Sequence, residues 1–126
     1  MAMIVGVMVP ELVMRTKVSG LVTAAGFTPR YVRSVSALSG EGASEEFQGL
    51  IVDLNGNESS IEELGPVLDS GLGGRALAFF SHVNAELGVR GRAAGFFQVI
   101  PRSKIEGVLP AFLGELAEFR QDPARE

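Results

Sequence analysis

Short apolar runs that alternate with amphipathic stretches constrain the fold of this chain more than any other feature. A run that is apolar throughout is typical of a strand covered on both faces. Five short runs are candidate strands, the second less apolar than the others: residues 3–9, 29–34, 49–54, 75–80 and 96–100. Strand and helix alternate with short connections, which predicts an α/β fold: one doubly wound, flavodoxin-like, five-stranded parallel sheet in the order 2-1-3-4-5, with helices on both faces.

The first helical stretch is clearly delimited, and the second is not. Pro10 suits the first turn of a helix, where its missing N–H is harmless, and Gly26 is a typical helix end. A helix over residues 11–25 would place its apolar residues on one stripe. Between residues 35 and 48, two glycines interrupt the pattern, so this segment predicts at most two short helical turns.

Capping residues mark the remaining helices. Ser60 and Ser103 are each followed three residues later by a glutamate, the pattern of a capping box, and each predicts the start of a helix. Asn84 is a candidate N-cap for a short fourth helix that Gly95 would close. In the last stretch, Pro110 predicts a break between a short turn and a main helix that begins there.

Length and composition indicate one ordinary domain. The chain has 126 residues, of which 46% are hydrophobic and 21% charged, and its net charge is −4. These values are typical of a folded globular chain. We expect the domain to cover residues 1–120 and residues 121–126 to form a flexible tail, because the end of the chain is polar.

The residue types that are missing exclude several functions. Without cysteine, the chain has no disulfide, no thiolate metal site and no cysteine nucleophile, and its single histidine, His82, cannot form a His-rich metal cluster. Scattered basic residues and mild acidity give no reason to expect a nucleic-acid partner. No apolar run approaches the length that spans a bilayer, and no basic leader precedes the first run. A cytoplasmic protein with no membrane association is the expectation.

The carboxyl ends of the predicted strands carry the candidate site. In open parallel sheets, ligands bind at this edge, beside the point where the strand order reverses. The candidate residues there are Asp53, Asn55 and Gly56 after the third strand, Ser81 and His82 after the fourth, and Arg102 after the fifth. Structural roles are the alternative: Asp53 can cap the turn at Asn55 and Gly56. Ser81 and His82 can bond local backbone, and Arg102 can be solvated or pair permanently with Asp53.

Three of these features resemble the receiver domains of two-component response regulators: Asp53 ends one apolar strand, Ser81 follows the next, and the segment Ala94–Arg102 ends the last. The likeness covers nearly the whole chain in layout but only part of the motifs. In that family, an aspartate accepts a phosphoryl group, and a hydroxyl and a lysine hold its oxygens. The resemblance therefore implies a phosphoacceptor position at Asp53 and a phosphate-holding hydroxyl at Ser81, with Arg102 in the place of the lysine.

The acidic pair that holds Mg²⁺ in receivers is absent. The corresponding positions are Met8 and Val9, and Glu11 lies too far along, at the expected start of a helix. Mg²⁺ requires oxygen ligands in near-octahedral geometry, and phosphoryl transfer depends on the metal to neutralise charge. Asp53 alone is a poor cage, so we expect no metal, no cofactor and a loss of phosphorylation, as in a pseudo-receiver.

Three functional hypotheses follow. The leading one is a non-enzymatic pseudo-receiver that signals through protein–protein contacts. The second is a receiver that still uses Asp53 as a phosphoacceptor, and the third is a sensor that grips a small anion or nucleotide with His82, Arg102 and the amides around Gly56. A conventional enzyme is the least supported class, because acid–base or nucleophilic catalysis needs a positioned group with a partner.

Five apolar residues near the C-terminus raise the question of a dimer. They are Phe96, Phe97, Phe112, Leu113 and Phe119. In receivers the usual dimer surface is the fourth helix, fifth strand and fifth helix, so the resemblance implies a homodimer there. The alternative is that all five side chains belong to the core.

Overall fold

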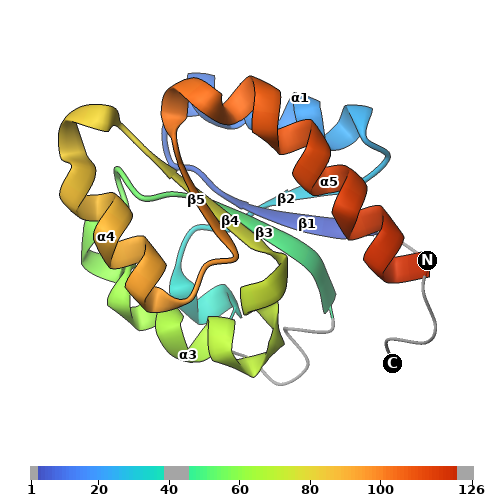
Figure 1. Cartoon of the computed structure of the whole chain (residues 1–126). Helices are drawn as coiled ribbons and strands as arrows, with labels where there is room; N and C mark the ends of the chain where they lie inside the picture. Colours follow the sequence, from blue (N-terminus) through green and yellow to red (C-terminus); the bar gives the residue numbers. More distant parts are fainter. Residues whose placement is uncertain (1–2, 39–45, 122–126) are drawn as a thin grey trace.

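The computed structural model describes residues 3–38 and 46–121, with side chains up to residue 118. Its five strands form one parallel sheet in the order β2-β1-β3-β4-β5 (Figure 1). The strands are β1 (Ile4–Met8), β2 (Thr28–Tyr31), β3 (Phe47–Asp53), β4 (Ala76–Phe80) and β5 (Gln98–Pro101). The predicted fold class and strand order are confirmed.

Helices cover both faces of the sheet. α1 (Leu12–Ala24) and α5 (Ile105–Gln121) lie side by side on one face, and α4 (Ala85–Ala94) lies with α3 (Gly65–Val67) on the other (Figure 1). The central strands are buried on both sides, which explains their nearly continuous apolar sequences. Within the described residues, no helix has the length and hydrophobicity needed to cross a bilayer.

Alternate residues of the central strands enter two apolar clusters. In β3, Ile51 packs with the side chains of α1 and α5, whereas Leu50 and Val52 pack with those on the α4 face. Val22 of α1 and Phe112 of α5 belong to the first cluster, and all five side chains are buried. Burying one apolar side chain of this size contributes about 1.5–3 kcal/mol. The central strands are therefore firmly held, and so are the residues at their ends.

The first helix begins later than predicted. Glu11 is its N-cap and α1 starts at Leu12, so Pro10 lies before the helix and not in its first turn. The side chain of Glu11 supplies the cap that a proline cannot, because it accepts two backbone N–H groups of the first turn. Gly26 follows the last turn with a φ of +92°, the left-handed conformation expected at a helix end.

Between β2 and β3, the structure describes one 3-10 turn (Val35–Leu38), which matches the first of the two predicted turns. The stretch up to residue 48 in which the sequence predicts helical turns is wrong at its end, because β3 begins there. Phe47 already belongs to β3, and its side chain is buried in the core. The two glycines of the predicted interruption lie outside the described residues, as do residues 122–126 of the predicted tail.

The third predicted helix is a series of short helical turns over residues 58–75, not one helix from Ser60. Ser60 ends the first turn and makes no capping bond. Pro66 has no N–H to donate to the turn before it, and Gly71 has a φ of +132°, which a helix does not contain. The apolar side chains predicted to face inward are nevertheless buried: Ile61, Leu64, Val67 and Leu68.

The last helix starts without its predicted capping box. Ser103 lies inside a 3-10 turn (Arg102–Lys104), and α5 follows as one helix through Pro110 (Figure 1). The break predicted at Pro110 is wrong. Buried residues on either side of it, Leu109 and Phe112, hold the helix against the sheet despite the missing hydrogen bond.

Most of the residues predicted to form a dimer surface belong to the core. Phe96, Phe112 and Leu113 are buried, so they are not available to a second subunit. The reason is that α5 covers a whole face of the sheet and needs a long apolar stripe to do so. Phe97 is 54% exposed and remains a surface residue, and the side chain of Phe119 lies outside the described part of the chain.

Candidate functional site

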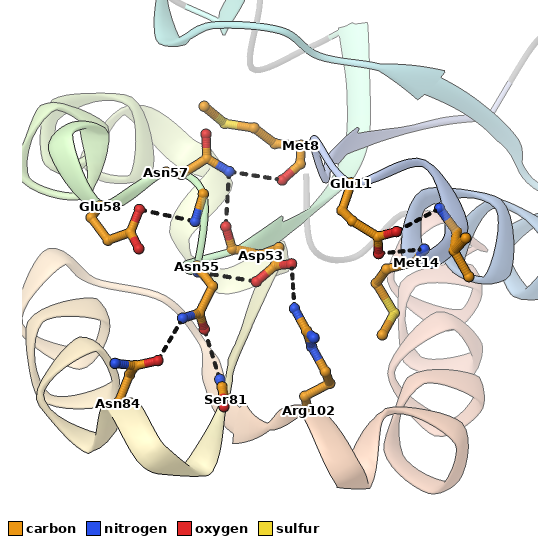
Figure 2. A network of polar contacts seen from close by, with 12 residues as sticks. Met8, Glu11, Met14, Asp53, Asn55, Asn57, Glu58, Ser81, Asn84 and Arg102 are labelled. Atoms are coloured by element: carbon orange, nitrogen blue, oxygen red, sulfur yellow. Dashed lines mark hydrogen bonds and ion pairs between the residues drawn. The ribbon is translucent and has the colours of Figure 1, made fainter.

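The segments that follow β3, β4 and β5 meet at the carboxyl edge of the sheet (Figure 2). Asp53, the last residue of β3, lies at the centre of a polar network there, with 1% of its surface exposed. Backbone pairing fixes its position, because Asp53 is in register with Phe79 of β4 and the next N–H, from Leu54, donates to the Phe79 carbonyl at 2.9 Å. The sheet therefore fixes the backbone that carries the carboxylate.

Both carboxylate oxygens of Asp53 accept hydrogen bonds from the protein. Oδ1 accepts from the backbone N–H of Asn55 at 3.0 Å, the local turn cap that Asp residues commonly form. Oδ2 accepts from Nη2 of Arg102 at 3.1 Å. The pairing of Asp53 with Arg102 that the sequence offered as one possibility is present, and it joins the ends of β3 and β5.

Burial raises the pKa of Asp53 from its ordinary value of 3.8 to about 6. The positive charge of Arg102 and the hydrogen bonds from Asn55 and Arg102 lower this pKa, but together they do not offset the loss of water. The negative charge of Glu58 raises it further. Asp53 is therefore ionised at neutral pH, and it takes up a proton in mildly acidic solution.

Arg102 approaches Asp53 from the first position of the turn that follows β5. Its side chain is 40% exposed, whereas that of Asp53 is 2% exposed, so the ion pair joins a surface cation to a buried anion. The Nε atom of Arg102 is buried and has no hydrogen-bond partner among the described residues. In the part of the chain that the structure describes, the hydrogen bond from Nη2 to Asp53 is what holds the guanidinium of Arg102 in place.

Asn55 connects the loop after β3 to the loop after β4. Its Oδ1 accepts from the backbone N–H of Ser81 at 2.7 Å, and its Nδ2 donates to Oδ1 of Asn84 at 2.8 Å (Figure 2). Asn84 occupies the N-cap position of α4, as predicted, but its side chain bonds Asn55 and does not cap the helix. Asn55 is thus a bridge between the two strand ends that flank the carboxylate.

Asn57, which the sequence pattern does not single out, ties β1 to β3. It is 7% exposed, and its Nδ2 donates to the carbonyl oxygens of Met8 at 3.2 Å and Asp53 at 2.8 Å. A buried amide that satisfies two strand-end carbonyls fixes their spacing, because each would be costly to leave unpaired. The signal in the sequence is the polar run Asn-Gly-Asn directly after a buried strand.

The other predicted cleft residues do not converge on the carboxylate. The N–H of Gly56, which has a φ of +90°, donates to Oε1 of Glu58 at 2.9 Å, so it is already engaged. His82 is exposed, and its side chain makes no hydrogen bond to a described residue. Ser81 contributes its backbone N–H to the network, not its hydroxyl. The structure therefore does not bring His82, Arg102 and the N–H of Gly56 together as an anion-binding site.

The residues at this edge do not fit Mg²⁺, the ion that the receiver resemblance implies. Met8 and Val9 have buried apolar side chains, and the Met8 carbonyl already accepts from Asn57. The carboxylate of Glu11 caps α1 through two backbone N–H groups, both at 3.0 Å. No group of three acidic, histidine or cysteine side chains within the described residues could hold a metal. A hard cation needs several oxygen ligands, and Asp53 directs its own toward N–H donors.

Several solved structures similar to this chain are response regulators. A receiver protein from Pseudoalteromonas atlantica gives a TM-score of 0.74 at 19% identity, over 93% of this chain and 98% of the other. A response regulator from Thermotoga maritima gives 0.69 at 14% identity, over 92% and 98%. A response regulator protein from Burkholderia pseudomallei, solved with a phosphorylated aspartic acid, a calcium ion and citrate, gives 0.63 at 17% identity, over 94% and 71%. No protein-family model matches the chain, and no curated protein does.

The chain therefore has the fold of response-regulator receiver domains, as the resemblance in its sequence implied. Because the sequence identities lie below 20%, the likeness shows the shared fold alone, and a fold does not by itself carry an activity. The function has to follow from the site: a buried carboxylate paired with an arginine, beside a first strand that ends in apolar side chains.

Proposed function

We propose that the protein is a non-enzymatic pseudo-receiver of two-component signalling, in which Arg102 pairs with Asp53 and takes the place of the metal ion. The observation that carries the proposal is the 3.1 Å contact between Nη2 of Arg102 and Oδ2 of Asp53. A guanidinium stays charged at every physiological pH and binds a carboxylate through directed N–H donors. It supplies a permanent positive charge to the site, so at neutral pH the domain is held in one state and acts as a binding module.

Two features of the site oppose phosphoryl transfer to Asp53. An attacking carboxylate oxygen must be within reach of the phosphoryl donor, but Asp53 is 1% exposed, and each of its oxygens accepts an N–H, which lowers its nucleophilicity. The charge that builds on a transferring phosphoryl group is normally neutralised by a metal, and Met8 and Val9 offer no side-chain ligand for one. Arg102 compensates for the charge of the carboxylate, but it cannot coordinate oxygen atoms as a metal does.

Exposed apolar side chains near α4 support a role in protein contacts. Val83, just before α4, is 74% exposed, Val89 on α4 is 62% exposed, and Phe97, just before β5, is 54% exposed. Single exposed apolar residues are common, and these three do not form one patch: Val83 and Val89 belong to the α4 segment, whereas Phe97 lines a hollow with Phe112 and Leu116 of α5, on the other face of the sheet. The proposal includes a protein partner or a second copy that contacts such exposed side chains, a cytoplasmic location and no nucleic-acid partner.

Intact-protein mass spectrometry after incubation with acetyl phosphate and Mg²⁺ tests the proposal. We expect no mass gain, while a phosphorylatable receiver in the same tube gains one phosphoryl group. Asp53→Asn and Asp69→Asn, which removes an exposed carboxylate, are the matched variants. A phosphoryl gain in the wild type that disappears in Asp53→Asn and persists in Asp69→Asn would overturn the proposal in favour of a working phosphoacceptor.

A further inference from the structure

The two partners of the ion pair differ in their freedom to move. Asp53 ends a central strand, its side chain is 2% exposed, and the N–H of Asn55 holds one of its oxygens, so it cannot leave the site. Arg102 reaches in from a turn at the surface, with 40% of its side chain exposed. Its buried Nε has no acceptor, so departure from the site sacrifices no hydrogen bond at that atom. The charge on Asp53 is therefore what keeps Arg102 in place.

Few other charges act on this carboxylate. Arg102 is the charged group that bonds Asp53. Glu58 raises the pKa of Asp53 through its negative charge, but its Oε1 accepts from the N–H of Gly56. Exposed His82 bonds no described residue, and Glu11 is occupied as a helix cap. The charged and titratable groups near this edge include Arg102 and Lys104 after β5, Glu58 after β3, His82 after β4, Glu11 before α1 and Arg15 on α1. Arg15 is engaged with the carbonyl oxygens of Val9 and Pro10.

We propose that the Asp53–Arg102 pair is a proton-operated latch: in mildly acidic solution, Oδ2 of Asp53 takes a proton from solvent and Arg102 leaves the site for the surface. The pKa of Asp53, raised by burial to about 6, sets the range. Above it the carboxylate is charged and holds the arginine. Below it the carboxyl group is neutral, and the half-buried guanidinium loses the attraction that compensates for its lost water.

The latch changes the surface charge at the edge of the sheet. Protonation removes one negative charge from the interior, and the arginine then presents its positive charge to solvent instead of to Asp53. The latch deepens the proposed function and rests on it, because it gives proton control to a site that phosphorylation no longer controls.

NMR spectroscopy of the full chain tests the latch. The Nε–H signal of Arg102 reports whether the guanidinium is held, and the carboxyl carbon of Asp53 reports its protonation. We expect both signals to shift with one shared midpoint near the pKa of about 6, and the heteronuclear NOE of the Arg102 Nε to fall on acidification. In Asp53→Asn, the Arg102 signal should already lie at its acidic position at neutral pH and should not move.

Two variants control for other sources of a pH response. His82→Gln removes the only imidazole of the chain, and Asp69→Asn removes an exposed carboxylate, and both should keep the Arg102 transition. An Arg102 signal that stays constant from about pH 5 to neutral pH, or a transition that survives in Asp53→Asn, would overturn the latch. If Asp53→Asn does not fold, the wild-type titration decides alone.

The latch and the proposed function fail in different experiments. A protein that shows the Arg102 transition but gains a phosphoryl group from acetyl phosphate has the latch and is a working phosphoacceptor. A protein that gains no phosphoryl group and shows no transition is a pseudo-receiver with a permanent ion pair.

Discussion

Replacement of Asp53 by asparagine should change how the stability of the protein depends on pH. The pKa of this carboxyl is about 6 in the folded chain, against an ordinary value of 3.8. A difference of about two pKa units corresponds to about 3 kcal/mol, at about 1.36 kcal/mol per unit. Because the folded pKa is raised, the stability contributed by the protonated group is fully present below the unfolded pKa and is lost as pH rises through the folded pKa.

From about pH 4 to about pH 7.5, linkage predicts that the wild type loses about 2.5 kcal/mol of stability through this one group. Asp53→Asn has no carboxyl to ionise, and the asparagine oxygen can still accept the N–H of Asn55. The free energy of unfolding of the variant, relative to the wild type, should therefore rise by about 2.5 kcal/mol over this range. The other titrating groups are common to both proteins and cancel in the difference.

Urea unfolding followed by circular dichroism at a series of pH values measures both free energies. Asp69→Asn removes the same charge from an exposed position and controls for the change in net charge. A difference between Asp53→Asn and the wild type that stays constant with pH, or that falls as pH rises, would refute the claim that burial penalises the charged form of Asp53.

Four further substitutions test contacts at the site and in the helices α1 and α4. Arg102→Ala should cost about 2 kcal/mol at neutral pH, below the value for a fully buried pair because the arginine is partly exposed, and much less in an Asp53→Asn background; urea unfolding of the four proteins measures the coupling. Asn55→Ala should lower the free energy of unfolding by about 1–3 kcal/mol. It should also speed hydrogen exchange of the Ser81 backbone amide, which Asn55 accepts from, and NMR can follow that exchange. Glu11→Ala should cost about 1 kcal/mol of unfolding free energy by removing the cap of α1. Gly88→Ala should destabilise by about 1–3 kcal/mol, seen as a lower melting temperature, because its Cβ would lie 2.8 Å from a phenylalanine ring.

Each of these predictions has a result that contradicts it. Additive effects of Arg102→Ala and Asp53→Asn would mean that the two side chains do not interact in solution. Unchanged exchange at the Ser81 amide in Asn55→Ala would mean that the side-chain bridge does not form. If Glu11→Ala is as stable as the wild type, the Glu11 side chain does not stabilise α1 as a cap. If Gly88→Ala is as stable as the wild type, the site has room for a Cβ beside the Phe80 ring.

The sheet could be predicted from sequence because its cause is local and repeated. A strand buried on both faces needs an apolar run, and Ile51 and its neighbours in β3 provide one that no amphipathic helix would contain. Short connections then leave few topologies. The position of Asp53 followed directly, because a polar residue at the end of such a strand must lie at the carboxyl edge.

Helix ends and side-chain partners could not be predicted, because tertiary contacts decide them. Asn84 has the right type and position for a cap, yet its side chain bonds Asn55, 29 residues away in the sequence. Pro110 has the right type to break a helix, but burial of the flanking apolar residues outweighs the lost hydrogen bond. Phe112 looks the same in sequence whether it faces a partner or the sheet, and only the packing of α5 shows that it is buried.

A Mg²⁺ titration followed by NMR at the amides of residues 53–57 most directly tests whether an arginine has taken the place of a metal at this carboxylate. We predict small, linear changes without saturation, equal in the wild type and in Asp53→Asn. Saturable shifts centred on Asp53 in the wild type, abolished in Asp53→Asn, would show that the carboxylate binds the ion and would contradict the assignment of this site to a pseudo-receiver.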